Sequence, residues 1–222
     1  PLDSLNETVR LAGGLTDDKM LDEATQARAL ACLHRFGERL RGLSPEAIRC
    51  VGTSALRVAR NADVFIPKAE IALGHPIEIV AGREEARLIY LGVAHSLPAS
   101  PDRRLVVDIG GGSTEFIIGH GLKPHERESL HMGCVNFSKR FFASGVIDKA
   151  ALKAAEVAAR VEVERIAREF STGNWQQAVG SSGTARALRE ILELNGWSAR
   201  GITADGLARL RSQFIKAGHI DA

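Results

Sequence analysis

The sequence predicts a mixed α/β fold, and three features of the chain support this prediction. Short apolar runs, each typical of a buried strand, alternate with longer segments whose apolar residues recur at helical spacing. Two apolar runs, residues 105–109 and 116–118, are separated by a glycine-rich turn, which indicates a β-hairpin. A third run, residues 177–179, leads through a loop of glycine and hydroxyl residues into a helical segment. Strands that alternate with helices in this way indicate an α/β protein.

The first half of the chain is predicted to alternate between helices and short strands. Thr16 can cap a helix that runs to about Arg41, because apolar residues recur there at three- and four-residue steps. The next predicted elements are a strand over residues 48–51, a helical stretch over 55–60, a helix ending before Gly74, a strand over 77–80 and a helix over 83–95.

A domain boundary is predicted at residues 97–103, where two prolines occur without any hydrophobic periodicity. This boundary divides the chain into residues 1–102 and residues 103–222. The elements expected after it are the hairpin, a strand over 128–131, helices over 136–142 and 148–170, a strand over 177–179 and a helix over 185–194.

The composition is that of an ordinary globular protein. Of the 222 residues, 45% are hydrophobic and 25% are charged, and the net charge is +2. This balance indicates neither nucleic acid nor an anionic membrane as a partner. No run of ~18 apolar residues and no signal-like leader occurs, so we expect no membrane span and a cytoplasmic location. The three cysteines, Cys32, Cys50 and Cys134, lack the paired spacing of a zinc site.

The turn between the two hairpin strands carries residues typical of a phosphate site. Gly110, Gly111 and Gly112 leave backbone N–H groups uncovered, and Ser113 and Thr114 add hydroxyl donors. A Walker A loop or a dinucleotide fingerprint would lead into a helix, whereas a strand follows here. The alternative is a plain tight hairpin without a ligand.

Two carboxylates flank this turn. Asp108 ends the strand before it, and Glu115 begins the strand after it. Mg²⁺ usually takes one or two carboxylates together with waters and substrate phosphates, so the pair predicts a Mg²⁺ site. The alternative for Asp108 is a structural turn residue that bonds its own backbone.

A second candidate phosphate loop lies between the strand at 177–179 and the helix that follows. It consists of Gly180, Ser181, Ser182, Gly183 and Thr184. The N–H groups at the start of a helix can bind an anion, which favours a phosphate or nucleotide contact. The alternative is a structural loop with a serine helix cap.

Five blocks of the sequence, in order, carry a family resemblance. They are GTSALR at 52–57, GREEARLIY at 82–90, DIGGGSTE at 108–115, MGCV at 132–135 and GSSGT at 180–184. Together they resemble the exopolyphosphatase and guanosine pentaphosphate phosphohydrolase family. The resemblance implies a ribonuclease-H-like fold of the actin, sugar-kinase and heat-shock ATPase superfamily, with two domains facing each other across a cleft.

The resemblance also implies that the chain is a fragment. Residues 1–102 are expected to be the C-terminal part of the first domain, and residues 103–222 an incomplete second domain. Family members carry a first phosphate loop that has no match in this sequence, and some have further helical domains. The fragment is therefore expected to have little activity by itself.

Two further residues are candidates for the site, Glu85 from the resemblance and Arg57 from its side-chain chemistry. The resemblance places at Glu85 a catalytic base that orients or deprotonates the attacking water, a task suited to a carboxylate. The alternative is that Glu84 and Glu85 only favour the first turn of a helix. Arg57 is a candidate clamp for phosphate oxygens, because its guanidinium presents a planar fork of donors.

The sequence therefore favours a Mg²⁺-dependent exopolyphosphatase that releases orthophosphate from inorganic polyphosphate. The nearest alternative shares the mechanism but hydrolyses guanosine pentaphosphate, and the triple glycine at 110–112 favours polyphosphate. An alternative of another class is a non-catalytic phosphate- or nucleotide-binding module. A kinase is less favoured because no sugar-site pattern is evident. A homodimer of the full-length protein is compatible with the resemblance.

Overall fold

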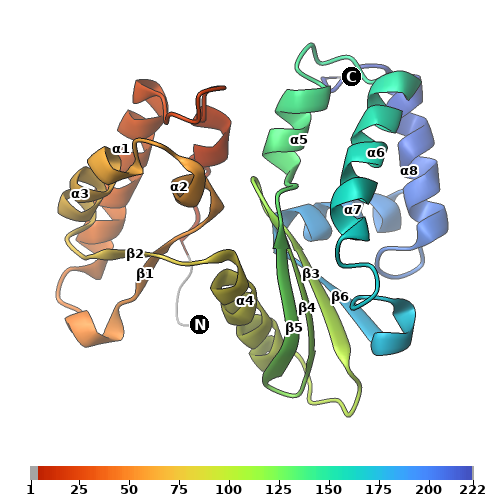
Figure 1. Ribbon diagram of the computed structural model, residues 1–222, viewed down its shortest axis with the longest axis horizontal. Coiled ribbons are helices and arrows are strands. Elements are labelled where there is room, and N and C mark those ends of the chain that lie inside the picture. Colours follow the sequence, from red (N-terminus) through yellow and green to blue (C-terminus); the bar gives the residue numbers. More distant parts are fainter. Residues whose placement is uncertain (1–4, 222) are drawn as a thin grey trace. The chain divides into compact units, whose positions relative to one another are not determined.

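The computed structural model describes residues 5–221, which form two compact units (Figure 1). The division falls between Ala81 and Gly82. It lies before the helix Gly82–Ser96 (α4), because that helix packs against the strands of the second unit. The predicted boundary follows this helix, at residues 97–103, so the compact units and the expected domains differ in the assignment of residues 82–102.

The first unit contains a two-stranded parallel sheet and its helices. The sheet consists of Cys50–Gly52 (β1) and Ile77–Ile79 (β2), with Val51 opposite Glu78. The other elements are the 3-10 helices Leu11–Gly14 (η1) and Pro45–Ala47 (η2) and the α-helices Glu23–Leu40 (α1), Ser54–Val58 (α2) and Ala62–Leu73 (α3).

Helix α1 begins later than the sequence predicts. The side chain of Asp22, not of Thr16, caps it by accepting a hydrogen bond from Thr25 N at 2.6 Å. The Thr16 hydroxyl instead accepts from Met20 N at 3.0 Å and closes a turn before the helix. Thr16 and Asp22 can both cap a helix and lie close together in the sequence, and the predicted cap, Thr16, is wrong.

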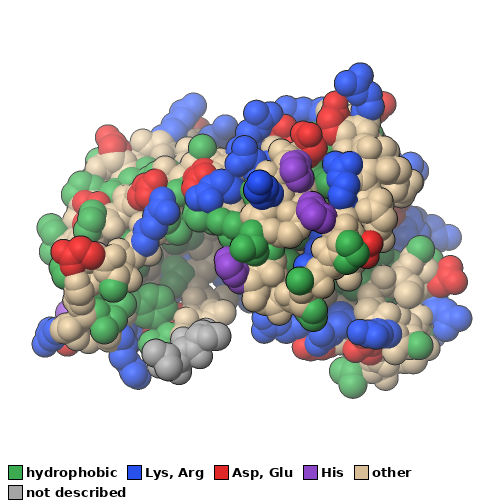
Figure 2. All heavy atoms as spheres, turned by 90° about the horizontal axis from the view of Figure 1, so that it is seen from below, with side chains coloured by type: hydrophobic (Ala, Val, Ile, Leu, Met, Phe, Trp, Pro, Cys, Tyr) green, Lys and Arg blue, Asp and Glu red, His purple; other side chains and the backbone are tan. Residues whose placement is uncertain are grey.

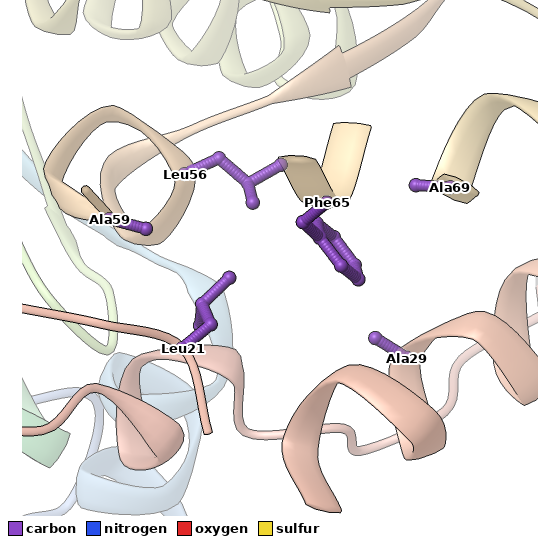
Figure 3. Close-up of a cluster of buried hydrophobic side chains, with 6 residues drawn as sticks. All are labelled: Leu21, Ala29, Leu56, Ala59, Phe65 and Ala69. Carbon is purple, nitrogen blue, oxygen red and sulfur yellow. The ribbon is translucent and has the colours of Figure 1, made fainter. Parts of the chain in front are cut away.

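The core of the first unit lies between α1, α2 and α3. Figure 3 shows its buried side chains, with Phe65 at their centre. They are Leu21, Ala29, Leu56, Ala59, Phe65 and Ala69. Gly37 lets α1 approach α3 closely, because a Cβ at this position would lie 2.6 Å from the Leu73 carbonyl oxygen. Burial of this apolar surface stabilises the unit.

The second unit is built on a four-stranded sheet in the order β5-β4-β3-β6. The strands are Arg104–Ile109 (β3), Thr114–His120 (β4), Lys123–Leu130 (β5) and Gln177–Ser181 (β6). Strand β4 is antiparallel to both β3 and β5, whereas β6 runs parallel to β3. The structure thus confirms the predicted hairpin. It also extends the strand expected at 128–131 back to Lys123, and ends the helix expected at 148–170 at Glu164.

Helix α4 covers one face of this sheet. Its residues Ala86 and Tyr90 form a buried cluster with Val106 of β3 and Ile117 of β4. The Tyr90 hydroxyl donates to the Gly121 carbonyl at 3.1 Å. Gly119 makes room for the ring, because a Cβ there would lie 2.3 Å from Tyr90 Cζ. These contacts fix the position of α4 along the strands.

The remaining elements of the second unit follow the hairpin in the chain. They are the α-helices Cys134–Phe141 (α5), Lys149–Glu164 (α6), Ser182–Leu194 (α7) and Ala204–Ala217 (α8) and the 3-10 helix Thr172–Asn174 (η3). Positive and negative side chains are interspersed over the face in Figure 2. Within residues 5–221, no helix combines the length and apolar character that a membrane crossing requires.

Candidate functional site

The glycine-rich turn between β3 and β4 is held from one side by the start of α5. Within the turn, Gly110 N donates to the Ser113 carbonyl at 2.9 Å. Every carbonyl of the three glycines accepts a hydrogen bond from α5. The bonds are Cys134 N to Gly110 O at 2.9 Å, Val135 N to Gly111 O at 3.0 Å, Asn136 N to Gly111 O at 3.2 Å and Asn136 Nδ2 to Gly112 O at 2.9 Å. The N–H groups in the first turn of α5 thus donate hydrogen bonds to the glycine turn.

This arrangement aims the N–H groups of the turn away from α5. In a trans peptide unit the carbonyl and the N–H of the next residue point in opposite directions, and no cis peptide occurs in the described chain. The N–H groups of Gly111, Gly112 and Ser113 therefore face away from the helix. None of the three donates to another group within residues 5–221. Consecutive N–H groups that point the same way can bind an anion.

The two hydroxyls beside the turn are engaged within the protein. Thr114 is buried, and its Oγ1 donates to the Met132 carbonyl at 2.5 Å. Ser113 is also buried, and its hydroxyl acts to lower the pKa of the nearby Glu115 carboxyl. In this structure the donors available to a ligand are thus backbone N–H groups rather than the predicted hydroxyls of Ser113 and Thr114.

Asp108 and Glu115 lie on the sheet face that α4 covers. They are directly opposite each other in the β3–β4 register. Side chains alternate along a strand, so Asp108 shares the face of Val106, and Glu115 that of Ile117. Glu115 is only 1% exposed, and its Oε1 accepts from Ser129 Oγ at 2.8 Å. Two like charges directly opposite on a sheet destabilise it unless something offsets them.

The third carboxylate of this group is Glu85, in the first turn of α4. Burial raises the pKa of Glu115, and the negative charges of Glu85 and Asp108 raise it further, whereas hydrogen bonds from two serines oppose the shift. The neighbouring Glu84 is paired with Arg87 instead, at 2.7 Å on the same helix. The predicted base and both predicted metal ligands therefore lie on one face of one unit.

The carboxylates fit a magnesium ion in their chemistry. No group of three or more His, Cys, Asp or Glu side chains in the described part of the chain is placed to hold a metal. Mg²⁺ does not need such a cage, because it usually takes one or two carboxylates and completes its shell with water and phosphate oxygens. A cation beside Asp108 and Glu115 would also offset their mutual repulsion.

The second predicted loop is bonded to the end of β3. Ser182 Oγ and Thr184 Oγ1 both donate to the Ile109 carbonyl, each at 3.0 Å. Ser182 has a φ of 68°, a left-handed conformation that residues other than glycine rarely adopt. Strand β6 ends with Ser181 opposite Asp108. The structure thus brings residues 180–184 beside the glycine turn, although two of their hydroxyls serve the fold.

The second loop also borders a hollow of about 990 Å³ in the same unit, whose lining includes Ser181, Ser182 and Arg186. Arg57 belongs to the first unit instead. Its Nη1 donates to the Val80 carbonyl at 2.8 Å. Of the predicted site residues, Arg57 alone lies before the division at Ala81.

Sequence reasoning missed the residues that support the turn. Asn136 and Ser129 each bond a group of the site, yet neither was a candidate. One signal was present for Asn136, because it follows Gly133 by three residues, the spacing of a capping box at a helix start. The MGCV block at 132–135 was noted for the resemblance without any structural role.

The fold and the site together define a class of protein. The fold is α/β, with a four-stranded mixed sheet, a glycine hairpin and helices packed against the sheet. The chain belongs to the Ppx/GppA phosphatase family, a phosphohydrolase family that matches it over residues 1–222.

The similar proteins fall into two groups according to the activity in their names. A guanosine-5'-triphosphate,3'-diphosphate pyrophosphatase from Pseudoalteromonas atlantica is 45% identical over 217 residues, which is 98% of this chain and 43% of the relative. An exopolyphosphatase-like protein of known structure has a TM-score of 0.77 at 25% identity, over 84% of this chain and 59% of that chain. An exopolyphosphatase from Cytophaga hutchinsonii has a TM-score of 0.70 at 26% identity, over 92% and 68%.

The chain spans less than half the length of the curated relative it matches. It spans about two thirds of the Cytophaga hutchinsonii structure. The relatives thus contain polypeptide that has no counterpart among these 222 residues.

Proposed function

We propose that the full-length protein hydrolyses the terminal 5'-phosphoanhydride of guanosine pentaphosphate and releases orthophosphate. The observation that carries the proposal is the relative named for guanosine-5'-triphosphate,3'-diphosphate, which is 45% identical over 98% of this chain. The glycine turn supports it, because a terminal phosphate carries several anionic oxygens and the turn offers three N–H donors.

The proposed mechanism assigns one task to each group of the second unit. The N–H groups of Gly111, Gly112 and Ser113 hold the oxygens of the terminal phosphate. Glu85 orients a water molecule and takes a proton from it as the water oxygen bonds to phosphorus. The bond from phosphorus to the bridging oxygen breaks, and that oxygen leaves with the nucleotide. Positioning and charge stabilisation supply most of the rate enhancement in phosphoryl transfer.

Magnesium is part of the proposal. Asp108 and Glu115 are the residues that would hold it. When bound, the ion would neutralise charge on the phosphate oxygens. Glu115 is buried behind two serine hydroxyls, so within the pair Asp108 is the more accessible to an ion that also contacts substrate.

Inorganic polyphosphate is the second candidate substrate. The triple glycine at 110–112 favours it, and structures named for exopolyphosphatases superpose on the chain with TM-scores of 0.77 and 0.70. Their identities are 25% and 26%, against 45% for the relative named for the nucleotide. The greater identity favours the nucleotide.

The deciding experiment compares orthophosphate release from the two substrates by the full-length protein at equal concentration. We expect a higher kcat/KM for guanosine pentaphosphate, and a preference for polyphosphate would overturn the choice of substrate. Glu85→Gln separates a hydrolase from a binding module. We expect this variant to lose turnover by about 100-fold or more, as general-base removal commonly does.

Glu84→Gln is the matched control for the base. It lies on the same helical turn and is paired with Arg87, a partly exposed pair that contributes little. We expect its turnover to stay within about threefold of wild type. Binding of guanosine pentaphosphate without any phosphate release by the wild-type protein would support the binding module instead.

A further inference from the structure

Asn136 joins the start of α5 to the glycine turn through both ends of its amide. Its Oδ1 accepts from Gly133 N at 2.8 Å, and its Nδ2 donates to the Gly112 carbonyl at 2.9 Å. Its own backbone N–H donates to the Gly111 carbonyl at 3.2 Å. One residue therefore fixes two consecutive peptide units of the turn.

The turn needs such support because of its composition. Glycine has access to both signs of φ, so three glycines in a row can adopt many conformations. The carbonyl of Gly112 belongs to the same peptide unit as the N–H of Ser113, and these two groups point in opposite directions. By holding the Gly112 carbonyl, Asn136 aims the Ser113 N–H away from α5. The Gly111 carbonyl sets the Gly112 N–H in the same way.

Gly133 shows how closely α5 and the turn approach each other. A Cβ at this position would lie 2.5 Å from both the carbon and the oxygen of the Gly111 carbonyl group, and 2.6 Å from Gly112 N. Backbone therefore packs directly on backbone, and the Asn136 amide bonds to both segments. The turn and the start of α5 behave as one supported structure.

We propose that Asn136 is a positioning residue that holds the turn's N–H groups in their phosphate-binding arrangement. It acts through the turn and does not contact the substrate itself. The inference rests on the proposed role of the turn as a phosphate site. It adds a residue that lies 24 positions along the chain from the glycine it holds.

The test uses the full-length protein and two variants of Asn136. Asn136→Asp keeps an acceptor for Gly133 N but replaces the Nδ2 donor with an oxygen that repels the Gly112 carbonyl. Asn136→Ser removes the same donor without adding a negative charge, and it decides the outcome if the first variant does not fold. Asn195→Asp is the matched control, because Asn195 Nδ2 also donates one bond to a carbonyl, that of Ile191, at 2.8 Å.

The primary readout is binding of inorganic phosphate, which requires no turnover. With selective ¹⁵N labelling of glycine, we expect added phosphate to shift the Gly111 and Gly112 amide resonances in wild type and in the control. In the Asn136 variants we expect phosphate affinity to fall by about tenfold or more, the scale on which a misplaced anion donor acts. Thermal midpoints measured alongside would separate this effect from unfolding.

The second readout is steady-state turnover on guanosine pentaphosphate. We expect kcat/KM to fall by about 100-fold, with kcat reduced as well as KM raised, because the donors act on developing charge. Folded variants with wild-type phosphate affinity and kcat would overturn the positioning role. If wild type binds phosphate at the turn but hydrolyses neither substrate, the proposed function fails while the role of Asn136 is still decided by binding.

Discussion

Glu115 is a buried carboxylate that faces two other carboxylates, and this arrangement has a measurable cost. Burial raises its pKa above the ordinary value of 4.5, and the charges of Glu85 and Asp108 raise it further. Glu115→Gln keeps the shape and the acceptor for Ser129 Oγ but removes the charge. In the absence of divalent metal, we expect the variant to be more stable at neutral pH by roughly 1–3 kcal/mol, the usual cost of a poorly compensated buried polar group.

The pH dependence follows from the direction of the shift. A raised pKa means that the folded state holds the proton more tightly, so the contribution of Glu115 to wild-type stability is greatest below pH 4.5 and falls as pH rises through the folded-state pKa. The gain from Glu115→Gln should therefore shrink as pH falls toward 4.5. Both tryptophans, Trp175 and Trp197, lie in the second unit, so their fluorescence follows its unfolding.

Glu164→Gln is the control for this measurement, since Glu164 is an exposed carboxylate at the end of α6. A gain for Glu115→Gln that stayed constant from acidic to neutral pH would contradict the assignment of the shift to residue 115.

The candidate site shows what single residues reveal in a sequence. Glycines, hydroxyls and carboxylates within residues 108–115 indicated a phosphate and metal site, because these residue types have few other reasons to occur together. The sequence could not show that the hydroxyls of Thr114 and Ser182 face protein carbonyls, since those partners lie far along the chain. Asn136 was missed for the same reason, because its role depends on a contact across 24 residues.

At the scale of elements, α4 and β4 each contain a glycine, and the two glycines have opposite surroundings. Gly92 lies inside α4, and a Cβ there would meet no atom within 4 Å. We expect Gly92→Ala to stabilise the second unit by about 0.5–1 kcal/mol, because alanine restricts the unfolded chain and favours helix. Denaturant unfolding followed by tryptophan fluorescence measures the change.

Gly119 is the opposite case on the facing strand. Its substitution by alanine would drive a methyl group into the Tyr90 ring, which is fully buried. We expect Gly119→Ala to destabilise the unit by about 1–3 kcal/mol, as overpacked cores do. Equal effects of the two substitutions would mean that α4 does not pack on β4 through Tyr90.

Elements with a strong apolar pattern were predicted well, and polar ones were not. The hairpin and α4 follow from runs of buried residues such as Val106 and Ile117. Strand β5 was predicted too short because several of its residues, from Lys123 to Glu126, are polar and exposed, so no alternation marks them. Helix α8 was not predicted at all, although Thr203 caps it by accepting from Gly206 N at 3.2 Å.

At the scale of the whole molecule, the fold class could be predicted, and the compact units divide the chain at a different place from the predicted domains. Alternating strands and helices indicated an α/β protein, and the five motif blocks indicated the family that the comparison shows. The boundary was placed on the proline-rich segment at 97–103, because proline usually marks a linker. Composition does not reveal that the helix before this segment packs with the strands after it.

The proposed magnesium site on the α4 face predicts that the stability of the second unit depends on magnesium. An ion that binds the folded state and not the unfolded state stabilises the protein by about 2.7 kcal/mol when its concentration is 100 times Kd. Relief of the repulsion between Asp108 and Glu115 on binding would lower Kd, so less magnesium should give this gain than at an exposed pair. We expect magnesium to raise the thermal midpoint by several degrees in wild type and Glu164→Gln, but much less in Asp108→Asn.

Chelation should reverse the increase and, in the full-length protein, abolish phosphate release. An equal thermal shift in Asp108→Asn would place the ion elsewhere. The repulsion between Asp108 and Glu115 would then have to be offset by the substrate's contacts and not by the ion.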